Sequence, residues 1–317
     1  MFNVLVPERL DDVGEGMLEG KVNVLRGAGT DEKALCEAAP EADGIVLRSV
    51  ARITEAVLAC APRLRVVSRT GVGIDNIDVE ACTRHGVMVC YLPGINAYAV
   101  AEHTMAMMLA LLKQLPLMDR SVRNGNWGVR RQNLPQDASG KTLGILGLGR
   151  IGREVAARAR AFGMTVIGYD PYVTKLDGIE WAEMDDVVAR SDILTLHLPE
   201  SADTRRIINA ERLARMKPTA LLINASRGGV VDQRALVRAL QQGQIAGAAL
   251  DVFEDEPPAA DDGLLTLSNV ILTPHVAALT EQCGAAMMRE AVIQLLTALD
   301  GGLPPHIANA KELGLNK

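Results

Sequence analysis

Short runs of aliphatic and β-branched residues alternate along the chain with stretches in which apolar residues recur at helical spacing. The first series of apolar runs predicts strands at 3–7, 44–48, 64–70 and 87–93, with helices between them at 31–39, 53–61 and 78–86. The second series predicts strands at 142–147, 165–170, 193–199, 219–226, 245–252 and 269–274, with helices at 152–162, 209–216 and 233–243. Alternation of this kind is typical of repeated β-α-β units that form a mostly parallel sheet covered on both faces.

Because the alternation occurs twice, the sequence predicts two Rossmann-like, doubly wound parallel-sheet domains of the α/β class, with the active site in the cleft between them. One long helix is predicted from about 97 to 118 and another from 280 to 299. The last helix could return the chain to the first domain. We therefore predict a discontinuous substrate-binding domain, residues 1–97 and 290–317, and a nucleotide-binding Rossmann domain, residues 98–289.

Composition and charge exclude several classes of protein. The 317 residues are 48% hydrophobic and 23% charged, which is typical of a compact globular protein. A net charge of -6 provides no positive field for a nucleic-acid backbone, and the most apolar stretch, 97–118, is interrupted by Glu102, His103 and Lys113, so neither nucleic acid nor a membrane is an expected partner. The five scattered cysteines favour a reducing compartment, the cytoplasm, and form no cluster with metal-ligand spacing, so no metal is expected. The first residues resemble a strand and not a signal peptide.

Glycines 147, 149 and 152 form a GxGxxG pattern between a predicted strand and a predicted helix. This context indicates a dinucleotide site, in which Gly147 permits the turn, Gly149 lets backbone amides approach a pyrophosphate at the helix N-terminus, and Gly152 allows close packing. The next predicted strand ends in Asp170, which could accept hydrogen bonds from a ribose and would repel a 2′-phosphate. The pattern therefore favours NAD over NADP, although Asp170 could also be a turn acid before Pro171 and Lys175 lies nearby. Arg150 and Ile151, within the motif, and Pro171 are further cofactor-binding candidates.

Three polar residues follow the ends of predicted strands, where ligands bind in open parallel sheets. They are Arg227, Glu256 and His275. An arginine can hold and polarise an α-keto acid, and a histidine supported by a carboxylate can supply the proton as a hydride arrives. Each residue also has an ordinary structural interpretation, as a helix cap or surface ion pair, a solvated acid, or a hydrogen-bonding turn residue. Together beside a GxGxxG motif they predict a catalytic group.

Six motifs make the chain similar to the D-isomer-specific 2-hydroxyacid dehydrogenase family. They are GVGIDNID, LGLGRIG, HLP, NASRGG, DVFEDEP and TPH, and they extend over nearly the whole length. The resemblance implies that Arg227, Glu256 and His275 form the catalytic group, that Asp251 lies beside the nicotinamide, and that Val72, Gly73 and Asn96 bind the substrate. It also implies that His197, Leu198 and Pro199 border the adenine and that Thr204 and Ala225 line the cofactor. Ser226, next to the arginine, and Ala277, where relatives often have a glycine, complete the cofactor-binding candidates. Unlike some serine-pathway relatives, the sequence shows no additional regulatory module after the dehydrogenase motifs, so control by serine is not expected.

Two arginines suggest what the substrate carries. Arg48 and Arg69 end neighbouring predicted strands of the first domain and could bind a second anion, for which a phosphate, as in D-3-phosphoglycerate, is the preferred interpretation. Arg48 also lies in a motif shared with relatives that act on glyoxylate or hydroxypyruvate. We therefore predict an NAD-dependent D-2-hydroxyacid dehydrogenase, with a glyoxylate/hydroxypyruvate reductase and a non-catalytic NADH-sensing protein as alternatives.

The helix predicted at 97–118 also bears on assembly. It is rich in methionine and alanine and has too few polar residues for a full solvent face. A homodimer interface is one interpretation, which the family resemblance also implies. A central helix buried inside one subunit is the other.

Overall fold

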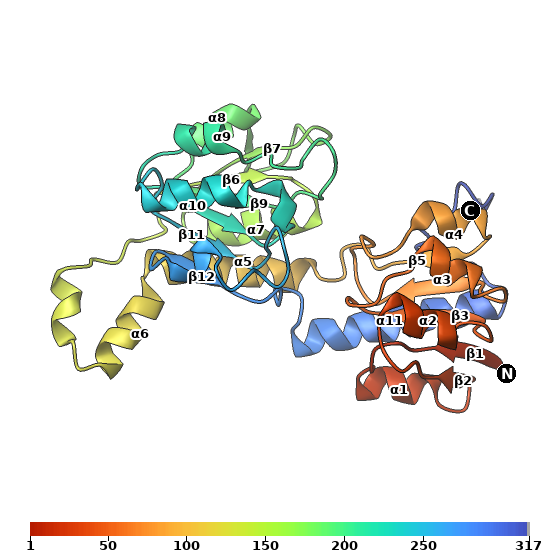
Figure 1. Cartoon of the computed structure of the whole chain (residues 1–317). Coiled ribbons are helices and arrows are strands. Elements are labelled where there is room, and N and C mark those ends of the chain that lie inside the picture. Colours follow the sequence, from red (N-terminus) through yellow and green to blue (C-terminus); the bar gives the residue numbers. More distant parts are fainter. Residues whose placement is uncertain (316–317) are drawn as a thin grey trace. The chain divides into compact units, whose positions relative to one another are not determined.

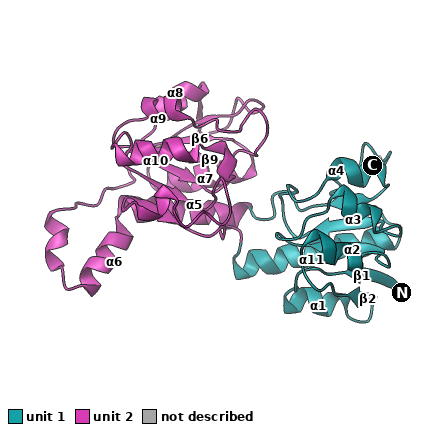
Figure 2. Cartoon of the chain, viewed as in Figure 1, with its two compact units in different colours: residues 1–96, 279–317 teal, residues 97–278 magenta. Residues whose placement is uncertain are grey.

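The structure, a computed structural model, describes residues 1–315, and the chain forms two compact units. Unit 1 contains residues 1–96 and the chain from 279 onward, and unit 2 contains residues 97–278 (Figure 2). The sequence predicts that residues 290–317 return to the first domain. In the structure the return begins earlier, because the whole helix α11 (Glu281–Leu299) belongs to unit 1 and the expected boundary at 289/290 falls inside it.

Unit 1 is built on a five-stranded sheet in the order β2-β1-β3-β4-β5, with every neighbouring pair parallel. The strands are β1 (Phe2–Leu5), β2 (Val22–Leu25), β3 (Gly44–Leu47), β4 (Val66–Arg69) and β5 (Met88–Cys90). Successive residues of a strand face opposite sides of the sheet, so Val4 and Leu5 enter different hydrophobic cores. Helices must therefore cover both faces.

Two groups of helices supply that cover. The core containing Val4 includes residues of α1 (Asp12–Leu18) and α11, and the core containing Leu5 includes residues of α2 (Glu32–Ala38), α3 (Glu55–Ala59) and α4 (Val79–Arg84). Thr280 caps the first turn of α11, since its hydroxyl accepts a hydrogen bond from the Cys283 amide. The return of the chain through α11 thus completes one face of the unit 1 sheet.

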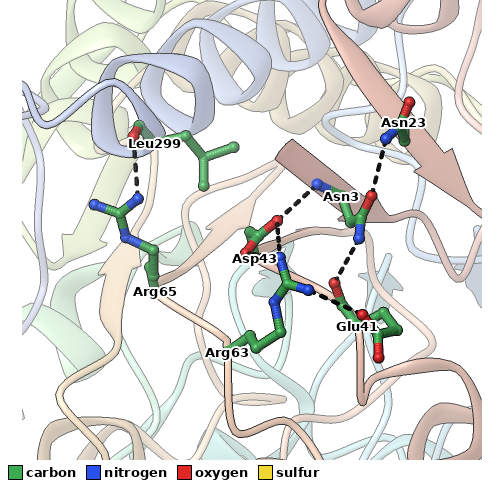
Figure 3. Close-up of polar contacts among 7 residues, drawn as sticks. All are labelled: Asn3, Asn23, Glu41, Asp43, Arg63, Arg65 and Leu299. Atoms are coloured by element: carbon green, nitrogen blue, oxygen red, sulfur yellow. Dashed lines mark hydrogen bonds and ion pairs between the residues drawn. The ribbon is translucent and has the colours of Figure 1, made fainter. Parts of the chain in front are cut away.

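A polar network lies toward the amino ends of these strands (Figure 3). Asp43, just before β3, accepts hydrogen bonds from the Asn3 amide at 2.8 Å and from Arg63 at 3.0 Å, and Arg65 donates to the Leu299 carbonyl at 3.3 Å. Asn3, Asp43 and Arg63 bind one another, and Arg65 separately joins the start of β4 to the end of α11. The carboxyl ends of the same strands are the other edge of the sheet, where the substrate-binding candidates lie.

Unit 2 is built on a seven-stranded parallel sheet in the order β12-β11-β10-β9-β6-β7-β8. Its strands are β6 (Thr142–Leu146), β7 (Thr165–Tyr169), β8 (Glu180–Trp181), β9 (Ile193–Leu196), β10 (Leu221–Asn224), β11 (Gly247–Leu250) and β12 (Val270–Leu272). The strand order reverses beside β6, which has β7 on one side and β9 on the other. A reversal of this kind marks the ligand-binding edge of a doubly wound sheet. The α/β class and the two parallel sheets predicted from the sequence are confirmed.

Helices cover both faces of the unit 2 sheet. One hydrophobic core includes residues of α8 (Met184–Arg190), α9 (Ala210–Arg215) and α10 (Gln233–Gln241), and the other includes residues of α5 (Ala97–Leu112) and α7 (Arg150–Ala161). Met105, Met107 and Met108 of α5 are buried in the second core. These methionines are therefore covered within one subunit, as in the interpretation of a buried central helix, and they do not supply a dimer interface. The homodimer itself stays a prediction.

The single helix predicted at 97–118 is two helices. α5 ends at Leu112, and α6 (Leu115–Arg123) begins after Gln114, which has a left-handed φ of 52°. Pro116 explains the break, since proline is tolerated in the first turn of a helix and disrupts a helix interior. The sequence analysis did not predict helices α1 and α8 or strands β2 and β8.

Helix α6 and the short 3-10 helix η1 (Trp127–Arg131) project from the rest of unit 2 (Figure 1). This arm, residues 113–137, exposes Leu115, Val122, Trp127 and Leu134, and Leu134 is 73% exposed. Residues 1–315 contain no helix with the length and apolar character needed to cross a membrane.

Candidate active site

The glycine motif lies between β6 and α7, at the reversal of the strand order. Gly147 has a φ of 97°, and a side chain there would meet the His197 carbonyl oxygen at 2.3 Å. A side chain at Gly152 would meet the Gly147 oxygen at 2.1 Å, whereas the space beside Gly149 is open. Gly149 is the N-cap of α7 and offers no side chain to its first amides. The loop therefore leaves room and backbone donors for a phosphate group.

Asp170 follows β7, and its carboxylate accepts hydrogen bonds from backbone amides of the surrounding loops. One carboxylate oxygen accepts a hydrogen bond from the Leu148 amide at 2.8 Å, and the other accepts from the amides of Tyr172 at 2.8 Å and Val173 at 3.1 Å. The side chain thus ties the glycine loop to the turn after β7. The interpretation of Asp170 as a turn acid describes these contacts, while its contact with a ribose stays a prediction.

The remaining cofactor candidates lie along the same edge of the sheet. His197 follows β9; its Nε2 lies 3.1 Å from the Thr195 hydroxyl, its Nδ1 is buried without a hydrogen-bond partner, and burial lowers its pKa to about 3. It is therefore neutral. The Thr204 hydroxyl donates to the Pro199 carbonyl at 2.6 Å and so closes the loop after β9. Leu198 and Ala225 are largely buried in the cores, Ile151 packs at the edge of one, and Arg150 and Pro171 are exposed.

His275 and Glu256 come together beyond β11 and β12. The two atoms His275 Nδ1 and Glu256 Oε2 are 2.7 Å apart, and the other oxygen of Glu256 accepts from the Phe253 amide at 3.1 Å. The hydrogen bond to Glu256 raises the pKa of His275, against the opposing effect of its burial. Burial acts to raise the pKa of Glu256, but the hydrogen bonds from His275 and Phe253 outweigh it and the pKa is lowered. The pair is therefore a carboxylate that orients an imidazole and favours its protonated form.

Arg227 lies on a loop that packs against the loop of Glu256, and its charge acts to lower the pKa of Glu256 and opposes the rise in the pKa of His275. Two neighbours shape its loop. The Asn224 amide donates to the Arg227 carbonyl at 2.9 Å, and a side chain at Gly228 would lie 1.7 Å from the Phe253 carbonyl oxygen. The loops that carry Arg227 and Glu256 can approach this closely only because residue 228 is a glycine.

Asp251 holds the turn on which His275 lies. It has no exposed surface; one carboxylate oxygen accepts from the Thr273 hydroxyl at 2.6 Å and the Val276 amide at 2.9 Å, and the other accepts from the Ala277 amide at 2.8 Å. Its predicted contact with the nicotinamide stays a prediction. Sequence reasoning did not single out Thr273 or Asn224, although each stands at the end of a predicted strand beside a candidate.

In unit 1, the substrate candidates lie at the carboxyl ends of β3 and β4. Leu47 pairs with Arg69, so Arg48 follows directly beside it. The Arg69 guanidinium lies against the next loop, since a side chain at Gly71 would meet its Nη1 at 2.7 Å. Arg48 donates to the Arg9 carbonyl at 2.7 Å, which is a structural contact. Val72 and Gly73 are half-buried in the loop after β4, and the side-chain oxygen of Asn96 is buried without a hydrogen-bond partner.

Comparison with known proteins identifies the family. Residues 105–277 match the model of the D-isomer specific 2-hydroxyacid dehydrogenase, NAD binding domain. A D-3-phosphoglycerate dehydrogenase from Synechocystis sp. is 42% identical over 95% of this chain, and the chain spans 55% of that protein's length. Other curated D-3-phosphoglycerate dehydrogenases at similar identity are likewise longer, and the chain spans 61% of the one from Methanocaldococcus jannaschii.

Two solved structures extend the likeness to whole chains. An NADPH-dependent glyoxylate/hydroxypyruvate reductase from Sinorhizobium meliloti is 30% identical with a TM-score of 0.89, covering 100% of both chains. A D-lactate dehydrogenase from Aquifex aeolicus, complexed with NAD and lactic acid, is 31% identical with a TM-score of 0.86, covering 96% of this chain and 98% of that one. The chain therefore belongs to the D-isomer specific 2-hydroxyacid dehydrogenase family, and residues 105–277 are its NAD-binding domain.

Proposed function

We propose that the protein is an NAD-dependent D-2-hydroxyacid dehydrogenase that interconverts a 2-hydroxy acid and its 2-keto acid. One observation carries the proposal most directly: His275 and Glu256 are hydrogen-bonded at 2.7 Å, near Arg227 and on the same sheet edge as the glycine loop. An oriented acid, a cation and a phosphate-binding loop are the parts that reduction of a keto acid requires.

The residues around the glycine loop fit a dinucleotide. The open space at Gly149 and the uncapped first turn of α7 would receive the pyrophosphate, and the buried, unpartnered Nδ1 of His197 lies on the adenine side that the family resemblance assigns. NAD, when bound as NADH, supplies the hydride. Asp170 favours NAD, because its carboxylate would repel a 2′-phosphate.

In the direction of reduction, Arg227 binds the carboxylate of the keto acid and polarises its carbonyl. His275 donates a proton from Nε2 to the carbonyl oxygen, because its Nδ1 is directed at Glu256. Glu256 keeps the ring oriented and stabilises its charged form. In the direction of oxidation, neutral His275 accepts the proton of the hydroxyl group. Ala225, Ser226 and Ala277 lie along the same edge, where they would contact the cofactor.

For the substrate we propose D-3-phosphoglycerate, with 3-phosphohydroxypyruvate as its keto acid. The names of the curated relatives support this substrate, and so does Arg69, a guanidinium group at the end of β4 in unit 1. Arg48, the second proposed phosphate ligand, would have to leave the Arg9 carbonyl to which it donates. Val72 and Gly73 are the proposed ligands of the substrate carboxylate in unit 1, and Asn96 is a further proposed substrate-binding residue. Glyoxylate or hydroxypyruvate is the second candidate, since the reductase from Sinorhizobium meliloti matches over its entire length.

We also propose a cytoplasmic homodimer. The described cysteines are all free, which suits a reducing compartment. The arm, residues 113–137, exposes Leu115, Val122, Trp127 and Leu134, and a second copy of this chain would cover them. Sedimentation at micromolar concentration tests the dimer. A monomer there, or a dimer that persists after Trp127→Ser and Leu134→Ser are combined, contradicts it.

A substrate panel tests the proposed activity. Purified protein is mixed with NADH and, in turn, with 3-phosphohydroxypyruvate, hydroxypyruvate, glyoxylate and pyruvate, and the loss of NADH absorbance is followed. The highest kcat/KM is expected for the phosphorylated acid, and Arg69→Ala is expected to raise KM far more for that acid than for glyoxylate. Equal effects would exclude the phosphate-binding role. Tight NADH binding without turnover of any acid would instead favour an NADH-sensing protein.

A further inference from the structure

His103, a polar residue of helix α5, points into the hydrogen bonds that support the His275 turn. His103 lies on α5, which packs across β10, β11 and β12. Its Nε2 is 3.1 Å from the Thr273 hydroxyl and 3.5 Å from Asp251 Oδ1, and its side chain is 22% exposed. His103 has no direct part in the reaction proposed for Arg227, Glu256 and His275.

The hydrogen bonds fix which groups donate. Thr273 gives its one hydroxyl proton to Asp251 Oδ1 at 2.6 Å, so it can only accept from His103. His103 must therefore carry a proton on Nε2 and donate it to Thr273, with the Asp251 carboxylate close by. This contact connects the helix to the ends of both β11 and β12, which are otherwise joined to α5 by apolar packing.

The turn that carries His275 has an unfavourable backbone conformation at this residue. His275 has a φ of 54°, a conformation that non-glycine residues rarely adopt without support. The support comes from Asp251: its carbonyl accepts from the His275 amide at 2.8 Å, and its carboxylate accepts from the amides of Val276 and Ala277 on the far side. Whatever fixes the Asp251 carboxylate therefore fixes the direction in which the His275 ring leaves the chain.

We propose that His103 is a positioning residue for His275, acting through Thr273 and Asp251. It donates one hydrogen bond to this network, and the network holds the left-handed turn that presents the ring to Glu256. An apolar side chain of similar size would fill the same volume on α5, so the donor itself carries the role. This inference rests on the proposed function, because it assigns His103 to the same reaction.

Three variants on α5 distinguish the effect of the His103 hydrogen-bond donor from the effect of its side-chain packing. His103→Leu removes the donor and keeps an apolar side chain, whereas His103→Gln keeps an Nε2 donor at similar reach. Glu102→Gln is the matched control, because the neighbouring Glu102 is exposed and its contact, 3.6 Å from Arg158, points away from the network. The measurements are kcat, KM for NADH, the free energy of unfolding, and the NMR titration of the His275 ring in protein labelled at histidine.

The expected result is a kcat lowered on the order of tenfold in His103→Leu, as for loss of one hydrogen bond in a partly buried network, with KM for NADH unchanged. His103→Gln is expected to recover most of the kcat. The titration of His275 is expected to move to lower pH in His103→Leu alone, because its ring no longer holds its place at Glu256. Glu102→Gln is expected to match the wild type.

Wild-type kcat and an unmoved His275 titration in His103→Leu would overturn the proposal. So would equal losses of kcat and stability in the leucine and glutamine variants, because packing alone would then explain them. If the wild-type protein turns over no keto acid, the proposed function fails, and the His275 titration by itself decides whether His103 positions the ring.

Discussion

Removing the charge of Glu256 tests the proposed role of His275 as the proton donor. His275 Nδ1 lies 2.7 Å from Glu256 Oε2. Glu256→Gln preserves the size of the side chain at position 256 and one of its oxygens, but it removes the negative charge. The pKa of His275 is raised mainly by this partner, so it is expected to fall toward its ordinary value of 6.5. The change therefore alters the titration of the ring while leaving the cofactor loop untouched.

The size of the shift follows from exposure. The side chains of His275 and Glu256 are 52% and 38% exposed, so water screens the pair and the water-like limit of Coulomb's law applies. Two charges about 4 Å apart then interact by about 1 kcal/mol. We therefore expect the pKa of His275 to fall toward its ordinary value in Glu256→Gln, with the lost attraction between the two charges limited to about 1 kcal/mol by the surrounding water.

The assay is the pH dependence of kcat in both directions. Reduction needs protonated His275, so its rate is lost as the pH rises through the raised pKa; in Glu256→Gln that loss is expected at lower pH. Oxidation needs neutral His275, so its rate is expected to persist to lower pH in the variant. Glu254→Gln is the control, since Glu254 lies on the same loop and pairs with Arg206. Profiles that do not move in Glu256→Gln, or that move equally in Glu254→Gln, would refute the assignment.

Three further variants test the loops around the site. Arg227→Lys is expected to lower kcat/KM by about 100-fold, because a point charge cannot replace the planar fork, while Kd for NADH stays constant; a wild-type kcat/KM would contradict the role. Gly228→Ala is expected to lower the free energy of unfolding by about 1–3 kcal/mol, because its Cβ would meet the Phe253 carbonyl at 1.7 Å; chemical denaturation measures the loss, and an unchanged midpoint would refute the close packing. Asp170→Ala is expected to weaken NADH binding, because the Leu148 amide in the glycine loop loses its partner. It is also expected to narrow the preference for NADH over NADPH, because the carboxylate that would repel a 2′-phosphate is gone. An unchanged ratio of the two Kd values would assign cofactor choice to other residues.

The apolar pattern predicted most of the fold because buried strands of parallel sheets are continuous aliphatic runs. Both sheets, their parallel strands and the terminal helix are present in the structure. Strand β2 could not be predicted because VNVL is a short edge strand with a polar residue inside it, and β8 could not because it has only two residues. The break between α5 and α6 could have been predicted from Pro116. The burial of the α5 methionines could not, because apolar residues around a whole helix fit both a core and an interface.

The candidate site was predictable to the extent that it depends on strand ends. Parallel strands bring their carboxyl ends to one edge, so Arg227, Glu256 and His275 could be expected near one another from the sequence. The roles of Asn224 and Thr273 could not, since they depend on which backbone and side-chain groups a turn brings within hydrogen-bond distance. The contact of His103 is harder still to predict from the sequence, because it joins residues 170 positions apart.

A single-turnover experiment with His275→Ala tests the central assignment most directly. Wild-type protein and variant, each saturated with NADH, are mixed rapidly with 3-phosphohydroxypyruvate, and the decay of NADH absorbance is recorded. Rapid decay is expected in the wild type, and a decay slower by about 100-fold or more is expected in the variant, although both bind NADH equally well. Equal decay rates in the two proteins would contradict the assignment of His275 as the proton donor.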